Sequence, residues 1–503
     1  MKICVIAPVI LNGPPQDSVK EFARAARIDC ETEMVFLDRG PESIESEYED
    51  ILAAPDVVLK AIEASKRGFD AVVVSCMLDP GVDQAREMLD IPVLGPAQIS
   101  MHIASMLGDK FSIITVLDRL IGPLYKRVNL YGLSNQLASV RAINVPVLEL
   151  EKDNNVIQLI INEAIHAIKE DHANVIVFGC TGMAGMANAV QEGLHKMGFN
   201  VPVVDPGVTA LKIAEVMVDL RISHSKMSFP YPKSVTDPKY SDLLEKKIEK
   251  QSTLKKWQVK TQYKSVVLTP ITNADILADA LRVTQSIARP DNQIRMELIN
   301  QGPRSIESRF DIMLASPYIL QKAKQMQEEG VRSLIINCMA DPALDATREI
   351  LDIPVFGVAK TVFLLASMLA HKFSIIVPLN RNISMMNELV CSYGLQEKVA
   401  SIRSIDQSVD LLELSRDITK DLLFKEIKQA VRADGAEAIV LGCTGFSSFL
   451  EDLITDLKFS DLNIPILEPS IITVKLLEAI VDLRLMHSKF RYPNPPPKLI
   501  RGY

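Results

Sequence analysis

The sequence repeats itself over almost its whole length, and this repeat restricts the fold more than any other feature. The stretch LASMLAHKFSIIVPLNR, Leu365 to Arg381, matches IASMLGDKFSIITVLDR, Ile103 to Arg119, which stands 262 positions earlier. A repeat of about 240 residues is too long for a solenoid and long enough to bury a core of its own. We therefore predict two tandem modules of one architecture, residues 1–232 and 263–503, joined by a linker at 233–262.

The predicted linker differs from the modules in composition. It is rich first in proline and then in charged residues, and it is nearly free of the apolar runs that form strands. Within it we expect one short helix near Leu243 to Gln251.

Within each module, short β-branched runs alternate with amphipathic stretches of helical length. In the first module the runs are Val35 to Leu37, Ala71 to Ser75, Phe111 to Thr115 and Val175 to Phe178. Runs that are apolar throughout are typical of parallel strands buried on both faces in α/β proteins. We predict an α/β fold with mostly parallel sheets. Such sheets bind ligands beyond the carboxyl ends of their strands.

Four of the predicted strands end on a cysteine. The stretches are VVVSCMLDPG with Cys76, VIVFGCTGMAG with Cys180, LIINCMADPALD with Cys338 and AIVLGCTGFSS with Cys443. A free cysteine is often only a small buried residue, but the repetition of both motifs favours a chemical role at the ligand-binding edge. We expect structural roles for the remaining three cysteines, Cys4, Cys30 and Cys391.

The residues around the cysteines predict tight turns next to helices. Asp79-Pro80 has the pattern of a helix N-cap followed by proline at the first helical position. Gly179 and Gly182 flank Cys180-Thr181, which allows a turn with exposed backbone N–H groups. Such groups can bind a carboxylate or a developing enolate oxygen, and they can lower the thiol pKa from its usual value of about 8.5.

Two further repeated motifs have structural interpretations. In Gly40-Pro41-Glu42-Ser43, Ser43 is the candidate N-cap of a helix, and its charged neighbours are interpreted as a solvated face. His224-Ser225-Lys226 recurs as His487-Ser488-Lys489. It has the pattern of a helix end, where cations interact favourably with the carbonyl dipoles.

Composition and charge point to a small-molecule ligand. The net charge is −8, and no Lys/Arg cluster stands beside aromatic residues, which argues against nucleic acid and membranes as partners. No apolar stretch approaches the roughly 20 residues that span a bilayer. The seven cysteines lack CxxC pairs and zinc-ligand spacing, which predicts free thiols in a reducing cytoplasm and no metal site. A homo-oligomer is compatible with the sequence.

Each half resembles a whole member of the aspartate/glutamate/hydantoin racemase superfamily, most of all its hydantoin racemase branch. The stretches that carry the resemblance are GPESIESEYEDILAAP, SCMLDPGVDQAREMLDIPVLGP, DKFSIITVLDR and VIVFGCTGMAG, with their counterparts in the second half. The resemblance implies two similar α/β subdomains per module, an active site between them and no cofactor. It also implies facing cysteine pairs, Cys76 with Cys180 and Cys338 with Cys443.

The resemblance and the thiol motifs together predict a cofactor-independent racemase or epimerase for an amino-acid-like or hydantoin-like compound. One thiolate removes the proton next to a carbonyl, and a thiol on the other face returns one. The alternatives are a superfamily decarboxylase or cis–trans isomerase with the same thiol pocket, and a non-catalytic small-molecule sensor. We expect the ligand to contact Pro8, Met77, Thr115, Thr181 and Gly182 in the first module, and Pro270, Met339, Thr444 and Gly445 in the second.

The two halves depart from the family pattern to different degrees. The hydantoin racemase branch usually carries an Asn-Pro-Asn-Thr-like loop after its first strand, whereas this chain has Ala7-Pro8-Val9 and Thr269-Pro270-Ile271. In the second half Thr115 is replaced by Val377, Gly81 by Ala343, and the GCTGMAG turn by GCTGFSS. We therefore predict that the first module is the main catalyst and that the second is weaker or has another substrate range.

Overall fold

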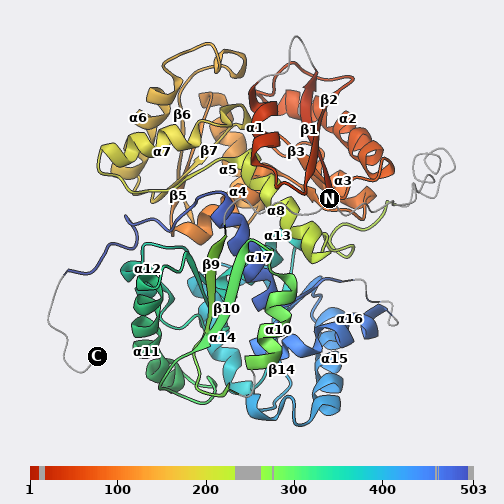
Figure 1. Cartoon of the computed structure of the whole chain (residues 1–503). Coiled ribbons are helices and arrows are strands. Elements are labelled where there is room, and N and C mark those ends of the chain that lie inside the picture. The colour runs from red at the N-terminus through yellow and green to blue at the C-terminus, as the bar shows by residue number, and fades with distance from the viewer. Residues whose placement is uncertain (11–16, 233–261, 275–276, 459–461, 463, 497–503) are drawn as a thin grey trace. The chain divides into compact units, whose positions relative to one another are not determined.

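The computed structural model describes residues 1–10, 17–232, 262–274, 277–458, 462 and 464–496 (Figure 1). The chain divides into two compact units, Met1–Gln258 and Val259–Tyr503, and each contains one copy of the repeat. We call their described parts the first and the second module. The predicted linker at 233–262, including its expected helix at Leu243 to Gln251, lies outside the described residues except for residue 262.

The first module contains two α/β subdomains, each built on a four-stranded sheet. The strand orders are β2-β1-β3-β4 and β6-β5-β7-β8, and all neighbouring strands are parallel. The elements are β1 (Lys2–Ile10), α1 (Asp17–Ala25), β2 (Glu31–Leu37), α2 (Glu47–Lys66), β3 (Ala71–Val74), α3 (Val82–Met88), β4 (Val93–Leu94), α4 (Pro96–Leu107), β5 (Phe111–Thr115), η1 (Asp118–Leu120), α5 (Ile121–Leu130), β6 (Leu137–Ala142), η2 (Val147–Glu149), α6 (Val156–Lys169), β7 (Val175–Phe178), η3 (Thr181–Met183), α7 (Ala187–Lys196), β8 (Val203–Val204) and α8 (Pro206–Leu220).

The second module repeats this arrangement with the orders β10-β9-β11-β12 and β14-β13-β15-β16, again all parallel. Its elements are β9 (Tyr263–Thr269), α10 (Leu277–Ile287), β10 (Asn292–Leu298), α11 (Arg309–Glu328), β11 (Ser333–Ile336), α12 (Leu344–Ile350), β12 (Val355–Gly357), α13 (Val358–Leu369), β13 (Phe373–Val377), α14 (Asn380–Ser392), η6 (Gln396–Lys398), β14 (Val399–Ser404), η7 (Val409–Leu411), α15 (Arg416–Arg432), β15 (Ala438–Leu441), η8 (Thr444–Phe449), α16 (Leu450–Lys458), β16 (Ile466–Leu467) and α17 (Pro469–Asp482). The predicted tandem α/β fold with parallel sheets is confirmed.

Two helices join the subdomains of the first module. Helix α4 follows the first sheet and packs on β7 of the second, whereas α8 follows the second sheet and packs on β3 of the first. The two helices also pack on each other, and every residue of α4 is buried. Because each helix crosses to the other subdomain, the carboxyl ends of the two sheets are held beside each other.

Asp79 caps α4, and not the helix that directly follows it as its pattern predicts. Its carboxylate accepts hydrogen bonds from the N–H groups of Ala97 and Gln98 at 3.0 and 3.1 Å. Asp79 itself has a positive φ of 50°, which turns the chain back toward α4. A Cβ at Gly95 would lie 2.3 Å from the Asp79 carboxyl carbon, so glycine is required there. The same contacts recur around Asp341.

The cap of α2 is Ser46, and not Ser43 as the sequence pattern predicts. The Ser46 side chain accepts from the Glu49 N–H, and Ser308 caps α11 in the same way. Ser43 instead lines a cavity.

The repeated motif His224-Ser225-Lys226 lies beyond the end of its own helix, α8, but its lysine caps another helix. Lys226 donates to the carbonyls of Arg86, Glu87 and Leu89 at the end of α3. His224 is buried against Phe229.

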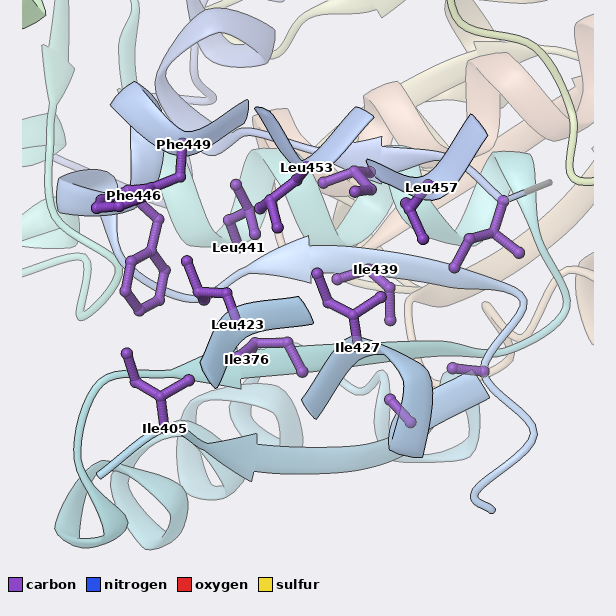
Figure 2. Packing of buried hydrophobic residues seen from close by; sticks show 14 of the residues in the cluster. Ile376, Ile405, Leu423, Ile427, Ile439, Leu441, Phe446, Phe449, Leu453 and Leu457 are labelled. Carbon is purple, nitrogen blue, oxygen red and sulfur yellow. The ribbon is translucent and has the colours of Figure 1, made fainter. Parts of the chain in front are cut away.

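The core of the second sheet in the second module fixes the turn after Cys443. Phe446 and Phe449 of η8 are fully buried in a cluster with Leu423 and Ile427 of α15 and Leu453 of α16 (Figure 2). Cys443 packs against this cluster. The aromatic side chains therefore hold the turn that carries the thiol.

Candidate active site

A cavity of about 360 Å³ in the first module brings the two predicted thiols together. Cys76 follows β3 of the first sheet, Cys180 follows β7 of the second, and both line this cavity. Four of the five residues predicted to contact the ligand in this module also line it: Pro8, Met77, Thr181 and Gly182. The cavity thus lies at the carboxyl ends of the strands in both subdomains, with one thiol from each.

Thr115 is the exception, because it does not line the cavity. It is fully buried in β5, and its hydroxyl donates to the Gly179 carbonyl at 3.4 Å. A Cβ at Gly179 would lie 2.7 Å from the Thr115 Cβ, so the turn before Cys180 packs directly on this side chain. Thr115 therefore supports the turn before Cys180 by packing against it. This buried position corrects the expectation that Thr115 contacts the ligand directly.

Backbone N–H groups point at each of the two thiols. The Gly182 N–H donates to the sulfur of Cys180 at 3.3 Å, and the Leu78 N–H donates to that of Cys76 at 3.5 Å. These bonds favour the thiolate form of each cysteine. The predicted turn with exposed donors is thus present.

Burial nevertheless has the larger effect on thiol acidity. It raises the pKa of Cys180 to about 11, although the Gly182 N–H acts in the opposite direction. It also raises the pKa of Cys76 well above its usual value, with Asp50 and Asp79 adding to the shift. The N–H donors therefore act in the direction that the sequence suggests, but burial outweighs them. A thiolate with a raised pKa is, however, a stronger base for a weakly acidic carbon.

Two side chains connect the subdomains across the cavity. The Thr181 hydroxyl donates to the Ser75 carbonyl at 2.9 Å, which ties the Cys180 turn to the Cys76 turn. Glu45, which precedes α2, accepts from the Val147 N–H at 2.8 Å and pairs with Arg119. Val147 and its neighbour Leu148 line the cavity, so Glu45 fixes part of the wall.

The role of Glu45 contradicts the prediction of a solvated charged face. Its side chain is only 12% exposed, and Glu307 makes the same bond to the Val409 N–H at 2.9 Å in the second module. A signal for this existed in the repeat: Glu45 recurs as Glu307, whereas the nearby Glu42 is replaced by Arg304.

The second module places its predicted residues in the same order along the chain. Cys338 follows β11 and Cys443 follows β15. Cys443 adds to the raised pKa of Cys338. Burial raises the pKa of Cys338 to about 12 and that of Cys443 to about 11. The Gly445 N–H donates to the sulfur of Cys443 at 3.3 Å. The other predicted residues occupy matching positions in the chain: Pro270 follows β9, Met339 follows Cys338, and Thr444 and Gly445 lie in η8.

A polar cluster distinguishes the surroundings of Cys338 from those of Cys76. The Asn337 amide donates to the Thr269 hydroxyl at 3.3 Å, and the Ser470 hydroxyl donates to the Asn337 side-chain oxygen at 2.8 Å. The corresponding residues of the first module are Ser75, Ala7 and Gly207. Within the described part of the chain, Thr444 makes no hydrogen bond to Asn337 like that from Thr181 to Ser75.

Comparison with known families decides the relationship. The sequence profile of the family described as Asp/Glu/Hydantoin racemase matches residues 17–214 and again residues 266–477. The chain belongs to this family. It holds two family domains in tandem, as the repeat predicts.

Individual relatives align with about half of this chain. A hydantoin racemase of Pseudomonas sp. (strain NS671) is 38% identical over 231 residues, which are 45% of this chain and 91% of that protein. A hydantoin racemase of Rhizobium meliloti is 31% identical over 238 residues, 47% of this chain and 97% of that protein. Among solved structures, an allantoin racemase from Klebsiella pneumoniae is 28% identical, covers 48% of this chain and 97% of its own, and has a TM-score of 0.45.

In the ranges that the structure describes, no helix combines the length and apolar character needed to cross a membrane.

Proposed function

We propose that this racemase-family chain is a cofactor-independent racemase or epimerase that acts by proton transfer between two thiols. The substrate class is an amino-acid-like or hydantoin-like compound with a hydrogen on the carbon next to a carbonyl. The observation that carries the proposal is the placement of Cys76 and Cys180, from two subdomains, in the lining of one cavity. The similarity to hydantoin racemases supports the choice of substrate class.

The reaction needs one thiolate and one thiol on opposite faces of the substrate. The thiolate removes the α-proton, and the electron pair of the C–H bond passes to the carbonyl as an enolate. The second thiol donates its proton to the other face, so the configuration is inverted and the cysteines exchange protonation states. The N–H groups of Leu78 and Gly182 stabilise whichever sulfur is charged.

The direct test is hydrogen exchange at the substrate carbon. Hydantoins, amino acids and dicarboxylic acids are incubated with the full chain in deuterium oxide, and NMR follows the loss of the α-proton signal. We expect exchange that proceeds with inversion, that resists chelators and that stops after thiol alkylation. Loss of a carboxylate from the substrate would instead identify a decarboxylase, and isomerisation of an alkene would identify a cis–trans isomerase. If a compound binds but no compound exchanges its α-proton, the chain is a non-catalytic sensor.

A further inference from the structure

A buried ion pair stands behind the Cys76 turn in the first module. Arg127 of α5 donates to a carboxylate oxygen of Asp50 in α2 at 3.3 Å, and the two side chains are only 25% and 13% exposed. Both residues line a second cavity of about 450 Å³, together with Asp79 and Gly81 of the Cys76 turn. The pair therefore lies beside the turn that carries Cys76.

This buried ion pair has fewer hydrogen bonds than buried charges usually have. Among the described residues, no donor reaches Asp50 Oδ1, although that oxygen is buried. Buried carboxylates normally receive several hydrogen bonds, because an unsatisfied one loses its hydration without compensation. The pair thus contributes little to stability where it stands.

The second module shows that the fold does not need the pair. Ile312 and Leu389 occupy the equivalent positions, and they line one cavity with Met339 next to Cys338. Helix α11 has the same length there as α2 has in the first module. Replacement of a buried ion pair by apolar residues is often neutral or stabilising. A role in the active site explains why the first module holds the costlier arrangement.

The charges around Cys76 define what the pair can do. Burial contributes most to the raised pKa of Cys76, and Asp50 of α2, Asp79 of its own turn and Cys180 of the other subdomain add to it. The charge of Arg127 in α5 also interacts with Cys76. Asp50 in turn faces Arg127, Asp79 and Glu47, and burial raises its pKa to about 6. Above that pH its negative charge opposes a second negative charge on Cys76. Among the described residues, the charges that raise the pKa of Cys338 are those of Cys443 and Asp341.

We propose that Asp50, held by Arg127, is a positioning residue that keeps Cys76 protonated, so that the first module begins its cycle with Cys180 as the base and Cys76 as the acid. The assignment of acid and base rests on the proposed racemase function. The control of Cys76 by Asp50 does not, because it acts on the thiol before any substrate binds. Because Ile312 and Leu389 stand in place of the pair in the second module, we expect its two thiols to share their proton more evenly.

The test measures thiol reactivity without any substrate. The full chain is alkylated with iodoacetamide from pH 6 to 10, and peptide mass spectrometry gives separate rates for Cys76 and Cys338. Asp50→Asn removes the opposing charge, so we expect Cys76 to react about tenfold faster at pH 8 while Cys338 in the same molecule is unchanged. Asp83→Asn serves as a matched control, since Asp83 lines the same cavity and pairs with Arg86; it should leave both rates within twofold.

A second variant keeps the proposal falsifiable if Asp50→Asn does not fold. The double change Asp50→Ile/Arg127→Leu installs the side chains that the second module already tolerates, and it should move the pH profile of Cys76 toward that of Cys338. An unchanged Cys76 rate in a folded variant would overturn the proposal. Equal acceleration of both cysteines would also overturn it, since that outcome indicates general loosening. Racemisation could persist in either case, so failure here is distinct from failure of the proposed function.

Discussion

The two modules carry their thiols on the same turns but support those turns with different side chains. In the first module, Thr181 bonds to the Ser75 carbonyl across the cavity. In the second, Asn337 is held by Thr269 and Ser470. Both modules keep the backbone N–H donor to the second thiol, Cys180 or Cys443. Both also keep a glutamate that accepts from the N–H of Val147 or Val409 and an aspartate, Asp79 or Asp341, that caps the helix joining the subdomains. The comparison separates the parts that place the thiols from those that can adapt to a ligand.

The largest expected effect is the pH dependence of alkylation at the buried thiols that the two modules share, Cys180 and Cys443. Because burial raises the pKa of both Cys180 and Cys443 to about 11, the thiolate fraction of each grows about tenfold per pH unit below that value. We expect both alkylation rates in the substrate-free chain to rise about 1,000-fold from pH 7 to pH 10. A plateau of either rate below pH 9 would show that one turn lowers the thiol pKa, as the sequence alone suggested.

The next effect concerns the carboxylates that hold the cavity wall. Glu45→Ala and Glu307→Ala each remove a charged hydrogen-bond acceptor worth about 2 kcal/mol, which corresponds to about 30-fold in a local opening equilibrium. Hydrogen exchange followed by mass spectrometry should show this acceleration at Val147 and at Val409, respectively. Glu42→Ala is the control, since Glu42 is exposed and not repeated. Protection that persists in both alanine variants would contradict the assigned role.

A smaller effect should distinguish the modules. Thr181→Val removes a hydrogen bond of about 1 kcal/mol that Thr444→Val does not, so it should slow turnover about fivefold more. Each variant is assayed in a chain whose other module has both thiols replaced by alanine. Equal losses would mean that the bond to Ser75 does not position the thiols.

A difference in stability should also distinguish the turns after the first cysteine of each module. Gly81 has a φ of 68°, and a Cβ there would lie 2.7 Å from the Ala54 carbonyl oxygen, whereas Ala343 tolerates a φ of 55°. Gly81→Ala should destabilise the first module by about 1–2 kcal/mol, and Ala343→Gly should stabilise the second by less than about 1 kcal/mol. Urea unfolding measures both. Destabilisation by Ala343→Gly would show that the packing of the Ala343 methyl group contributes more to stability than the positive φ of this residue costs.

The fold could be predicted because its signals are local and occur twice. Buried parallel strands are apolar throughout, so the runs ending at Cys76 and Cys180 are visible in the sequence, and the repeat shows that each module is complete in itself. The caps could not be assigned in the same way. Asp79 bonds to a helix that starts at Pro96, and only a backbone turn with positive φ brings them together.

The pKa values of the thiols and the burial of charged residues at the site are the features that the sequence predicts least well. A turn with N–H donors suggests an acidic thiol, but the degree of burial, which outweighs those donors, depends on how the two subdomains meet. Glu45 was missed for a similar reason, since a charged residue beside a helix start is usually solvated. Comparison of the two halves residue by residue would have identified it, because Glu307 persists where the surrounding charges change.

The most direct test of the account is α-proton exchange in deuterium oxide by two matched variants on one substrate, with folding of each confirmed. Cys76→Ala/Cys180→Ala removes the acid and base of the first module, and Cys338→Ala/Cys443→Ala those of the second. Loss of an acid–base pair costs about 100-fold or more, so we predict that the first variant loses most of the exchange and the second keeps most of it. The reverse result would assign the main activity to the second module. Undiminished exchange when all four cysteines are replaced would contradict the thiol mechanism itself.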